Sequence, residues 1–304
     1  MSRLTVQGAD PDNSAMRSDD DQWDVRSSVG KTAIALAQGR ALEALADDPL
    51  IVDEYAASFL RAAGEEVPTV AAGSAALAFV TLIVSVRARF FDDYLLSASA
   101  AGIRQVVSLA VGLDSRAYRM PWPADLALYE IDQPAVMDFK DRVLTDVGAV
   151  PSCVRHPIGM DLRNDWVSAL QASGFDTTRP TAWLIEGLTP YLTAAALRQL
   201  FERFASLSAP GSWLGIDVAG SAMLSSATRD DALRTIESEF EVDIDEITYP
   251  ESHFDHEAWL AQHGWTLETE TLTSIAGRYG RPLPEGLAGL AADYPFTIAH
   301  LAAD

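Results

Sequence analysis

Residues 106–119 read VVSLAVGLDSRAYR, in which an apolar run ends at Gly112 and a helical stretch follows. Residues 126–134 read LALYEIDQP and show the same pattern. Here the apolar run ends at acidic residues just before Pro134. Short apolar runs that alternate with helical stretches predict parallel strands joined by helical crossovers. These two stretches therefore predict the first two strands of an α/β sheet with helices on both faces.

The same alternation continues towards the C-terminus. It yields seven strand candidates, at residues 105–111, 127–131, 153–158, 182–185, 213–218, 266–271 and 296–301. Helical stretches separate the early ones, at residues 134–147, 166–173 and 194–207. We expect the last two strands to pair as an antiparallel hairpin at the edge. The predicted fold is thus a seven-stranded, mostly parallel, Rossmann-like sheet.

The chain changes character near residue 103. Before this point the pattern is helical, and we expect three helices, at residues 28–46, 53–63 and 74–101. The stretch at about 221–255 is rich in Asp and Glu, and we expect it to be an insertion over the sheet. The predicted divisions are a disordered acidic lead-in at 1–22, an N-terminal helical cover at 23–102, and a core at 103–304 with a cap at about 221–255.

Charge and cysteine content limit the partners. The chain has 22 Lys and Arg against 44 Asp and Glu, a formal net charge of −22. A surface this negative repels phosphate backbones and anionic lipid, which disfavours nucleic acid and membrane surfaces as partners. The apolar run at residues 75–86 is shorter than the about 20 residues that span a bilayer. Because Cys153 is the only cysteine and no signal peptide is visible, we expect a reducing, cytoplasmic location.

In a doubly wound sheet, ligands bind outside the carboxyl ends of the strands, where the strand order reverses. Gly112 follows the first strand candidate and allows a close backbone approach, because it has no Cβ and accepts positive φ. The glycine-rich GxGxxG cradle for pyrophosphate is absent from the sequence, which argues against a dinucleotide. A simple turn remains the alternative interpretation of Gly112.

Acidic residues follow three more strand candidates. Glu130 and Asp132 flank Ile131, so strand alternation puts both carboxylates on one side, and either could accept hydrogen bonds from a ribose diol. A solvated strand end is the alternative for each. Asp161 could accept from an adenine amino group beside Leu162, or it could cap a helix that begins near Asn164.

Glu186 ends an otherwise apolar strand candidate and precedes Gly187. A carboxylate is costly to bury without a cationic or donor partner, so Glu186 is expected to point into a site, although it could also reach solvent. Tyr191 adds a hydroxyl nearby, or it packs at the start of a helix. His253 and His256 are spaced like metal ligands, but a solvated turn is the preferred interpretation, and we expect no metal.

Read together, these stretches resemble the leucine carboxyl methyltransferase family. The resemblance is closest to its bacterial, mycobacterial-type branch of S-adenosylmethionine-dependent methyltransferases. It extends over nearly the whole chain after residue 22. The motifs that carry it are SVGKTAIALAQGRALE at 28–43, VRARFFDD at 86–93, GLDSRAYR at 112–119, YEIDQP at 129–134, DLRNDW at 161–166 and AWLIEGLTPYL at 182–192.

The resemblance implies a seven-stranded methyltransferase sheet that binds S-adenosylmethionine. It implies that Asp132 binds the ribose hydroxyls and that Asp161 and Leu162 contact the adenine. It further implies that Arg87 pairs with the carboxylate of the methionine half, and that Glu186 meets its amino group. The loop from Ala110 to Gly112 would pass under the cofactor. This loop reads Ala-Val-Gly, where the family usually has Gly-Ala-Gly. Lys31 falls near a basic residue of the eukaryotic members.

The resemblance also implies methyl transfer to a carboxylate oxygen of a small-molecule or lipid- or polyketide-like acid, with Tyr191 on the acceptor side. No Ser–His–Asp, metal-ligand or P-loop pattern is visible, and a carboxylate nucleophile needs no general base. Two alternatives stay open. One is a catalytically silent cofactor-binding protein with the same fold. The other is a nucleotide-dependent oxidoreductase, for which the glycine-rich loop and a Tyr–x–x–x–Lys pair are missing.

Overall fold

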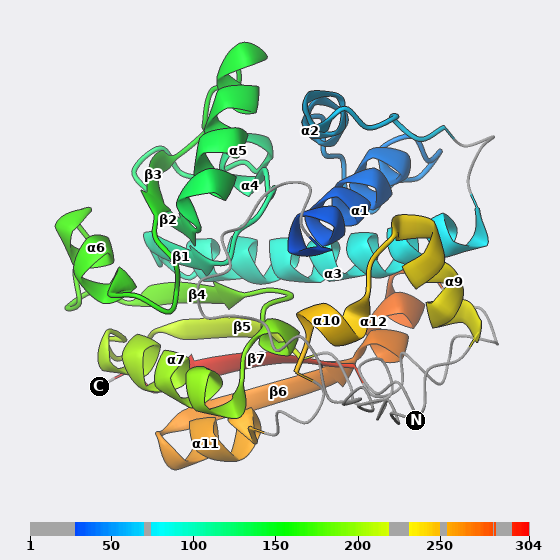
Figure 1. Cartoon of the computed structure of the whole chain (residues 1–304). Coiled ribbons are helices and arrows are strands. Elements are labelled where there is room, and N and C mark those ends of the chain that lie inside the picture. The colour runs from blue at the N-terminus through cyan, green and yellow to red at the C-terminus, as the bar shows by residue number, and fades with distance from the viewer. Residues whose placement is uncertain are drawn as a thin grey trace, which may run out of the picture.

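The computed structural model describes residues 28–69, 74–218, 231–249, 254–281, 283 and 294–303. It contains a seven-stranded sheet in the order β3-β2-β1-β4-β5-β7-β6 (Figure 1). The first five strands along the chain are parallel, and β7 is antiparallel to both of its neighbours. The strands are β1 Gln105–Leu109, β2 Ala127–Asp132, β3 Val154–Gly159, β4 Thr181–Ile185, β5 Trp213–Asp217, β6 Trp265–Thr271 and β7 Pro295–Leu301.

The predicted α/β class, with a mostly parallel seven-stranded sheet, is therefore confirmed. The last two strands are antiparallel partners at one edge, as expected, but they do not form a simple hairpin. The helix α12, Leu272–Arg278, follows β6, and β7 then enters between β5 and β6. The edge strand is consequently β6, and β7 is covered by a neighbour on both sides.

One face of the sheet packs against α3, Ala75–Ala100, together with α4, Arg116–Arg119, and α12. Ser74 caps α3, because its side chain accepts a hydrogen bond from the backbone N–H of Leu77. The helix then buries Phe91 and Leu95 against the sheet. Although its sequence belongs to the helical N-terminal part, α3 thus shares one core with the strands.

An outer layer covers the same face near β2. It consists of α1, Ser28–Glu43, and α2, Ala56–Ala63, which share a smaller core with α5, Pro134–Asp146. Phe59 of α2 and Phe139 of α5 meet in this core. The helix α1 also packs along α3, so the helices before β1 form two layers.

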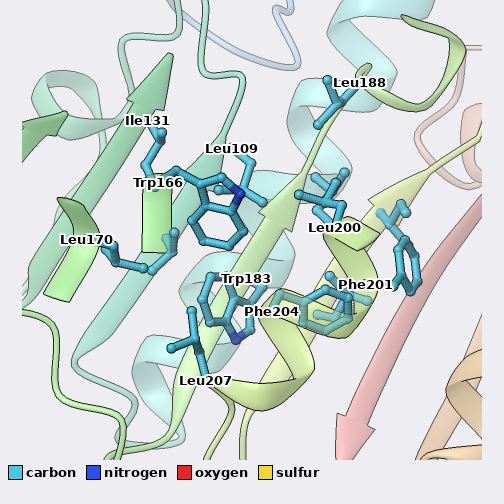
Figure 2. Close-up of a cluster of buried hydrophobic side chains, with 14 of the residues drawn as sticks. Leu109, Ile131, Trp166, Leu170, Trp183, Leu188, Leu200, Phe201, Phe204 and Leu207 are labelled. Atoms are coloured by element: carbon cyan, nitrogen blue, oxygen red, sulfur yellow. The ribbon is translucent and has the colours of Figure 1, made fainter. Parts of the chain in front are cut away.

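The opposite face packs against α6, Trp166–Ala172, α7, Ala194–Ser206, and α11, His256–Gln262. Trp166 and Trp183 are both fully buried in this core, and Phe201 and Phe204 of α7 pack nearby (Figure 2). Apolar strands with helices on both faces explain the continuous apolar runs of the central strands, because both sides of each strand are buried.

Two further helices lie in the stretch expected as an inserted cap. They are α9, Asp231–Phe240, and α10, Ile244–Ile247, and they contact α1 and α3 (Figure 1). The predicted lead-in at 1–22 lies outside the described residues, as does part of the predicted cap. Within the described part, no helix combines the length and apolar composition needed to cross a membrane.

Gly215 of β5 lies directly against the ring of Tyr94 of α3. A Cβ at this position would lie 2.7 Å from Cε1 and 2.9 Å from Cδ1 of Tyr94, whose hydroxyl donates to the carbonyl of Trp183. We expect Gly215→Ala to lower the free energy of unfolding by about 1–3 kcal/mol. The added Cβ would overlap the Tyr94 ring, and the hydroxyl bond to Trp183 keeps that ring in place. Thermal and denaturant unfolding would measure the change.

Gly277 provides the matched control. It lies within α12, and a Cβ there would meet nothing within 4 Å. Gly277→Ala should be neutral or stabilise the protein by up to about 1 kcal/mol through helix propensity. Equal loss of stability in the two variants would contradict the account of the Tyr94 contact.

Candidate functional site

A cavity of about 1040 Å³ opens at the carboxyl ends of the parallel strands. It lies where the strand order reverses, since β1 pairs with β2 on one side and with β4 on the other. The crossovers after β1 and β2 run along one face of the sheet, and those after β3 and β4 along the other. Eight of the residues nominated from the sequence line this cavity: Arg87, Ala110, Gly112, Asp132, Asp161, Leu162, Glu186 and Tyr191.

The loop after β1 turns sharply beneath the cavity. Gly112 has φ +51°, the left-handed conformation that glycine adopts without cost. Ala110 also has a positive φ of 53°. A left-handed alanine costs about 1–2 kcal/mol, so the surrounding structure must hold this residue in place. The sequence indicated the turn at Gly112 but gave no sign of the strain at Ala110.

Asp132 ties this loop to the end of β2. Its Oδ2 accepts a hydrogen bond from the Gly112 N–H at 2.6 Å, and its Oδ1 accepts from the Gln133 N–H at 2.7 Å. Burial raises the pKa of Asp132, and these two backbone donors oppose the shift. Each carboxylate oxygen retains a further lone pair, so Asp132 can still accept hydrogen bonds from a ligand.

Glu130, the other acid of this pair, does not line the cavity. It is fully buried, and its Oε2 lies 2.9 Å from Nζ of Lys140 and 2.7 Å from Nε of Arg155. These partners come from α5 and β3, so Glu130 joins the strand to its neighbours within the fold. Of the two acids that the strand pattern nominated, only Asp132 reaches the cavity.

The loop after β3 contributes Asp161 and Leu162. Asp161 pairs with Arg163, whose Nη2 lies 2.7 Å from Oδ2, and the Leu162 carbonyl accepts a hydrogen bond from Arg203 at 3.3 Å. The capping alternative for Asp161 is wrong, because Asp165 caps α6 by accepting from the Ser168 N–H. Asp161 is therefore held in the loop by its arginine and faces the cavity.

Glu186 lies between two arginines at the end of β4. Its Oε1 accepts from Nε of Arg87 at 2.9 Å, and its Oε2 accepts from Nη1 of Arg116 at 2.7 Å. The alternative of a solvent-reaching acid is wrong, because the Glu186 side chain is only 17 % exposed. Gly187 follows with φ +64°, and a Cβ there would meet Arg87 at 3.1 Å. Glycine at this position lets the guanidinium lie against the backbone.

Arg116 extends the pairing to Asp92 and Asp114. Its Nε donates to Asp92 at 2.6 Å and its Nη1 to Asp114 at 2.6 Å. Arg119 binds the other oxygen of Asp92. Burial would raise the pKa of Asp114, but the charges of Arg116 and Arg119 outweigh burial and lower the pKa well below its usual value.

Asp217 and Tyr294 close the network on the side of β5. Asp217 accepts from the Gly187 N–H at 2.7 Å and from the Tyr294 hydroxyl, and it lies 3.6 Å from Nη1 of Arg87. Burial raises the pKa of Asp217, which is only 1 % exposed. Three guanidinium groups thus face four carboxylates, and the members of this ion network are Arg87, Arg116, Arg119, Asp92, Asp114, Glu186 and Asp217.

Sequence reasoning missed most of this network. Asp114 and Arg116 stood in the quoted GLDSRAYR motif, but no role followed from their positions. Asp217 ends a buried strand just as Glu186 does, so the same rule about acids at strand ends could have found it. No local signal could have found Asp92 and Tyr294, because they reach the network only through tertiary packing.

Other nominated residues occupy different places. Tyr191 ends the short helix η2, Thr189–Tyr191, on the cavity wall beside Leu192. Lys31 does not line the cavity and pairs with the exposed Glu241 at 2.9 Å. His253 lies outside the described residues, and His256 begins α11. The described residues hold no group of three or more His, Cys, Asp or Glu side chains arranged to bind a metal ion.

Both the sequence and the fold are similar to those of known proteins. The sequence profile of the family described as "Leucine carboxyl methyltransferase" matches residues 33–205, more than half of the chain. A protein of Mycobacteroides abscessus is 44% identical over 276 residues, covering 88% of this chain and 91% of its own. A protein of Mycobacterium tuberculosis is 40% identical over 293 residues, covering 88% and 93%. Both carry the name "Putative S-adenosyl-L-methionine-dependent methyltransferase".

Two solved structures share the fold at low sequence identity. A DUF574 family protein of Streptomyces avermitilis superposes with a TM-score of 0.51 at 13% identity, covering 89% of this chain and 97% of its own. A "putative methyltransferase" of Thermobifida fusca gives 0.51 at 18% identity, covering 82% and 93%. The family match, the close relatives and the methyltransferase sheet agree. The chain belongs to the leucine carboxyl methyltransferase family and is an S-adenosyl-L-methionine-dependent methyltransferase.

Proposed function

We propose that this methyltransferase transfers its methyl group to a carboxylate oxygen of a small-molecule acid with a lipid- or polyketide-like body. The observation that carries the proposal is the chemistry of the cavity wall. Among the described residues that line the cavity there is no histidine, lysine or cysteine. These side chains most often act as bases towards alcohols, amines and thiols, which must lose a proton when they are methylated.

The carboxylates of the cavity are already engaged. Asp132 accepts from two backbone N–H groups, and Asp161 pairs with Arg163. Glu186 lies between two arginines, and Asp114 is held ionised by Arg116. These partners fix the position of each carboxylate, so the side chains are placed to bind and orient ligands. The cavity therefore suits a nucleophile that is ionised before it binds.

An acceptor carboxylate meets this requirement, because its pKa lies about two or more units below neutral pH. S-adenosylmethionine supplies a methyl group on a positively charged sulfur, which is a good leaving group. A lone pair of the acceptor oxygen forms the new O–CH₃ bond as the C–S bond breaks. The electron pair of the C–S bond remains on sulfur, so no proton moves. The task left to the protein is alignment and exclusion of water, and orientation of this kind supplies on the order of 7 kcal/mol or more.

The cofactor suits the end of the cavity formed by the strand loops. We assign the ribose hydroxyls to Asp132, which lines the cavity and has lone pairs left to accept hydrogen bonds. We assign the adenine to Asp161 and Leu162. The turn at Ala110 and Gly112 brings backbone close to this region. The acid after the second strand lies twenty residues beyond Gly112, the usual arrangement for a ribose-binding carboxylate.

The methionine half suits the ion network. Arg87 contacts Glu186, Tyr294 and Asp217 through Nε and Nη1, so we assign Nη2 to the cofactor carboxylate. We assign the cofactor ammonium to Glu186, whose oxygens each accept one bond from arginine and can each accept another. The excess of carboxylates over guanidinium groups in the network favours a ligand that brings positive charge. Tyr191 is assigned to the acceptor side.

We expect Asp132→Ala to weaken binding of S-adenosylmethionine about ten-fold or more, because a charged acceptor for two hydroxyl groups is lost. Isothermal titration calorimetry would measure the affinity. Asp146→Ala is the matched control, since Asp146 is exposed on α5 and does not line the cavity. Unchanged affinity in a folded Asp132→Ala variant would contradict the ribose assignment.

The pH dependence of cofactor binding tests the same assignment. Burial raises the pKa of Asp132, so on acidification its carboxylate takes up a proton at a higher pH than a free aspartate does. Affinity should therefore be full at neutral pH and should fall as the pH is lowered towards that pKa. The Asp132→Ala variant should lack the loss of cofactor affinity that protonation of Asp132 causes. An identical pH profile of affinity in both proteins would exclude the assignment.

The acceptor prediction needs a panel of acids, amines, alcohols and thiols incubated with radiolabelled cofactor. We expect label only in acids, as esters that dilute alkali hydrolyses. The rate should be nearly flat between about pH 6 and 9, because the acceptor is already ionised and the described cavity lining holds no histidine, lysine or cysteine. Label that appears only in amines or thiols, or a rate that rises steeply near neutral pH, would reject carboxyl methylation.

A further inference from the structure

One part of the cavity wall comes from three elements that are distant in sequence. The helix α1 contributes Thr32, Ala33 and Leu36. The segment after η2 contributes Leu192, Thr193 and Ala196, together with Tyr191 of η2 itself. Tyr249, just after α10, completes this wall. We call these residues the far wall: Thr32, Ala33, Leu36, Tyr191, Leu192, Thr193, Ala196 and Tyr249.

Three contacts hold Tyr249 and its segment in place. The backbone N–H of Tyr249 donates to the carbonyl of Pro190 at 2.9 Å, which brings residue 249 beside Tyr191. At the other end of the segment, Lys31 of α1 donates to the carboxylate of Glu241 at 2.9 Å. The helix α10 also packs on α1, and its residue Ile247 is buried. The α9–α10 segment is thus fixed between α1 and η2.

The ion pair contributes little to this arrangement, because the Glu241 side chain is 79% exposed and solvent screens the pair. The buried Ile247 and the backbone bond to Pro190 are better anchors, since they are shielded from water. Tyr249 therefore has a defined place on the wall, set by packing and by the backbone.

The far wall differs chemically from the rest of the cavity. None of its side chains carries a charge, whereas the rest of the lining includes Arg87, Glu186 and Arg116 of the ion network together with Asp132 and Asp161. The nearest charged lining residue on α1 is Arg40, whose Nε donates to Asp53 at 2.8 Å and whose Nη2 donates to the Leu113 carbonyl. Its charge is already compensated within the fold.

We propose that the far wall binds the body of the acceptor, that this body is apolar and uncharged, and that Tyr249 determines this specificity. The proposal rests on the proposed carboxyl methylation. It adds that the part of the acceptor attached to the reacting carboxylate must be uncharged. A monocarboxylic acid can place its single charge at the cofactor end and its chain or ring against Tyr249. A second carboxylate at the tail would lie against the far wall without a cationic partner, which is costly.

Binding can be tested apart from catalysis. Isothermal titration calorimetry would measure octanoic acid and octanedioic acid against the protein saturated with S-adenosylhomocysteine, the product form of the cofactor. We expect octanoic acid to bind about ten-fold or more tightly than the diacid of equal length. Tyr249→Ala should weaken octanoic acid binding about ten-fold, and Tyr249→Phe should retain most of it, because the apolar ring is the contact.

Two controls accompany this test. Affinity for S-adenosylhomocysteine should be the same in wild type and Tyr249→Ala, since Tyr249 is not among the residues assigned to the cofactor. Tyr279→Ala truncates a tyrosine that does not line the cavity and should leave octanoic acid binding unchanged. Absence of octanoic acid binding, equal affinity for both acids, or an unaffected Tyr249→Ala variant would each overturn the inference.

Failure of the proposed function would look different. Octanoic acid that binds as expected, in a protein that methylates only amines or thiols, would overturn carboxyl methylation while leaving the apolar far wall intact. Acids that are methylated at equal rates with and without a second carboxylate would overturn the specificity inference while leaving carboxyl methylation intact.

Discussion

The pairing of Glu186 with Arg87 and Arg116 is the interaction on which the site depends. It joins α3, the loop after β1 and the end of β4, and Asp217 extends it to β5. Each charge in this network has left water, and its cost is offset only by its partners. Removal of one member would leave the others buried and uncompensated, at a cost of about 3–5 kcal/mol. The helix α3 therefore serves the core and the site together, because its Phe91 packs on the sheet while its Arg87 reaches Glu186.

The same pairing limits the chemistry. Glu186 is held between two arginines, so its position is fixed from both sides. Asp132 is engaged in another way, since its two backbone bonds fix the loop at Ala110 and Gly112. The strained alanine in that loop is compatible with a rigid platform, because Asp132 and the neighbouring strand hold the turn in place. Rigid platforms favour reactions whose main requirement is alignment.

The cavity is thus chemically divided. The loops that follow the parallel strands, together with Arg87 of α3, supply most of its charged side chains, while the far wall is uncharged and includes two phenol rings. Methyl transfer from a charged donor to an acid with an apolar body suits such a division, since each partner meets a wall of matching chemistry.

The sequence by itself determined the strands, the class of sheet and the residues at the strand ends. Apolar runs report burial locally, and parallel topology then brings residues such as Asp132 and Glu186 to one edge without knowledge of any contact. Only the tertiary structure decided which acids meet which partners. It turned Glu130 towards Lys140 and Arg155, gave Asp92 and Tyr294 their places in the ion network, inserted β7 between β5 and β6, and brought Tyr249 beside Tyr191. These contacts join residues far apart in the chain, and their geometry depends on how the helices pack, which local periodicity does not encode.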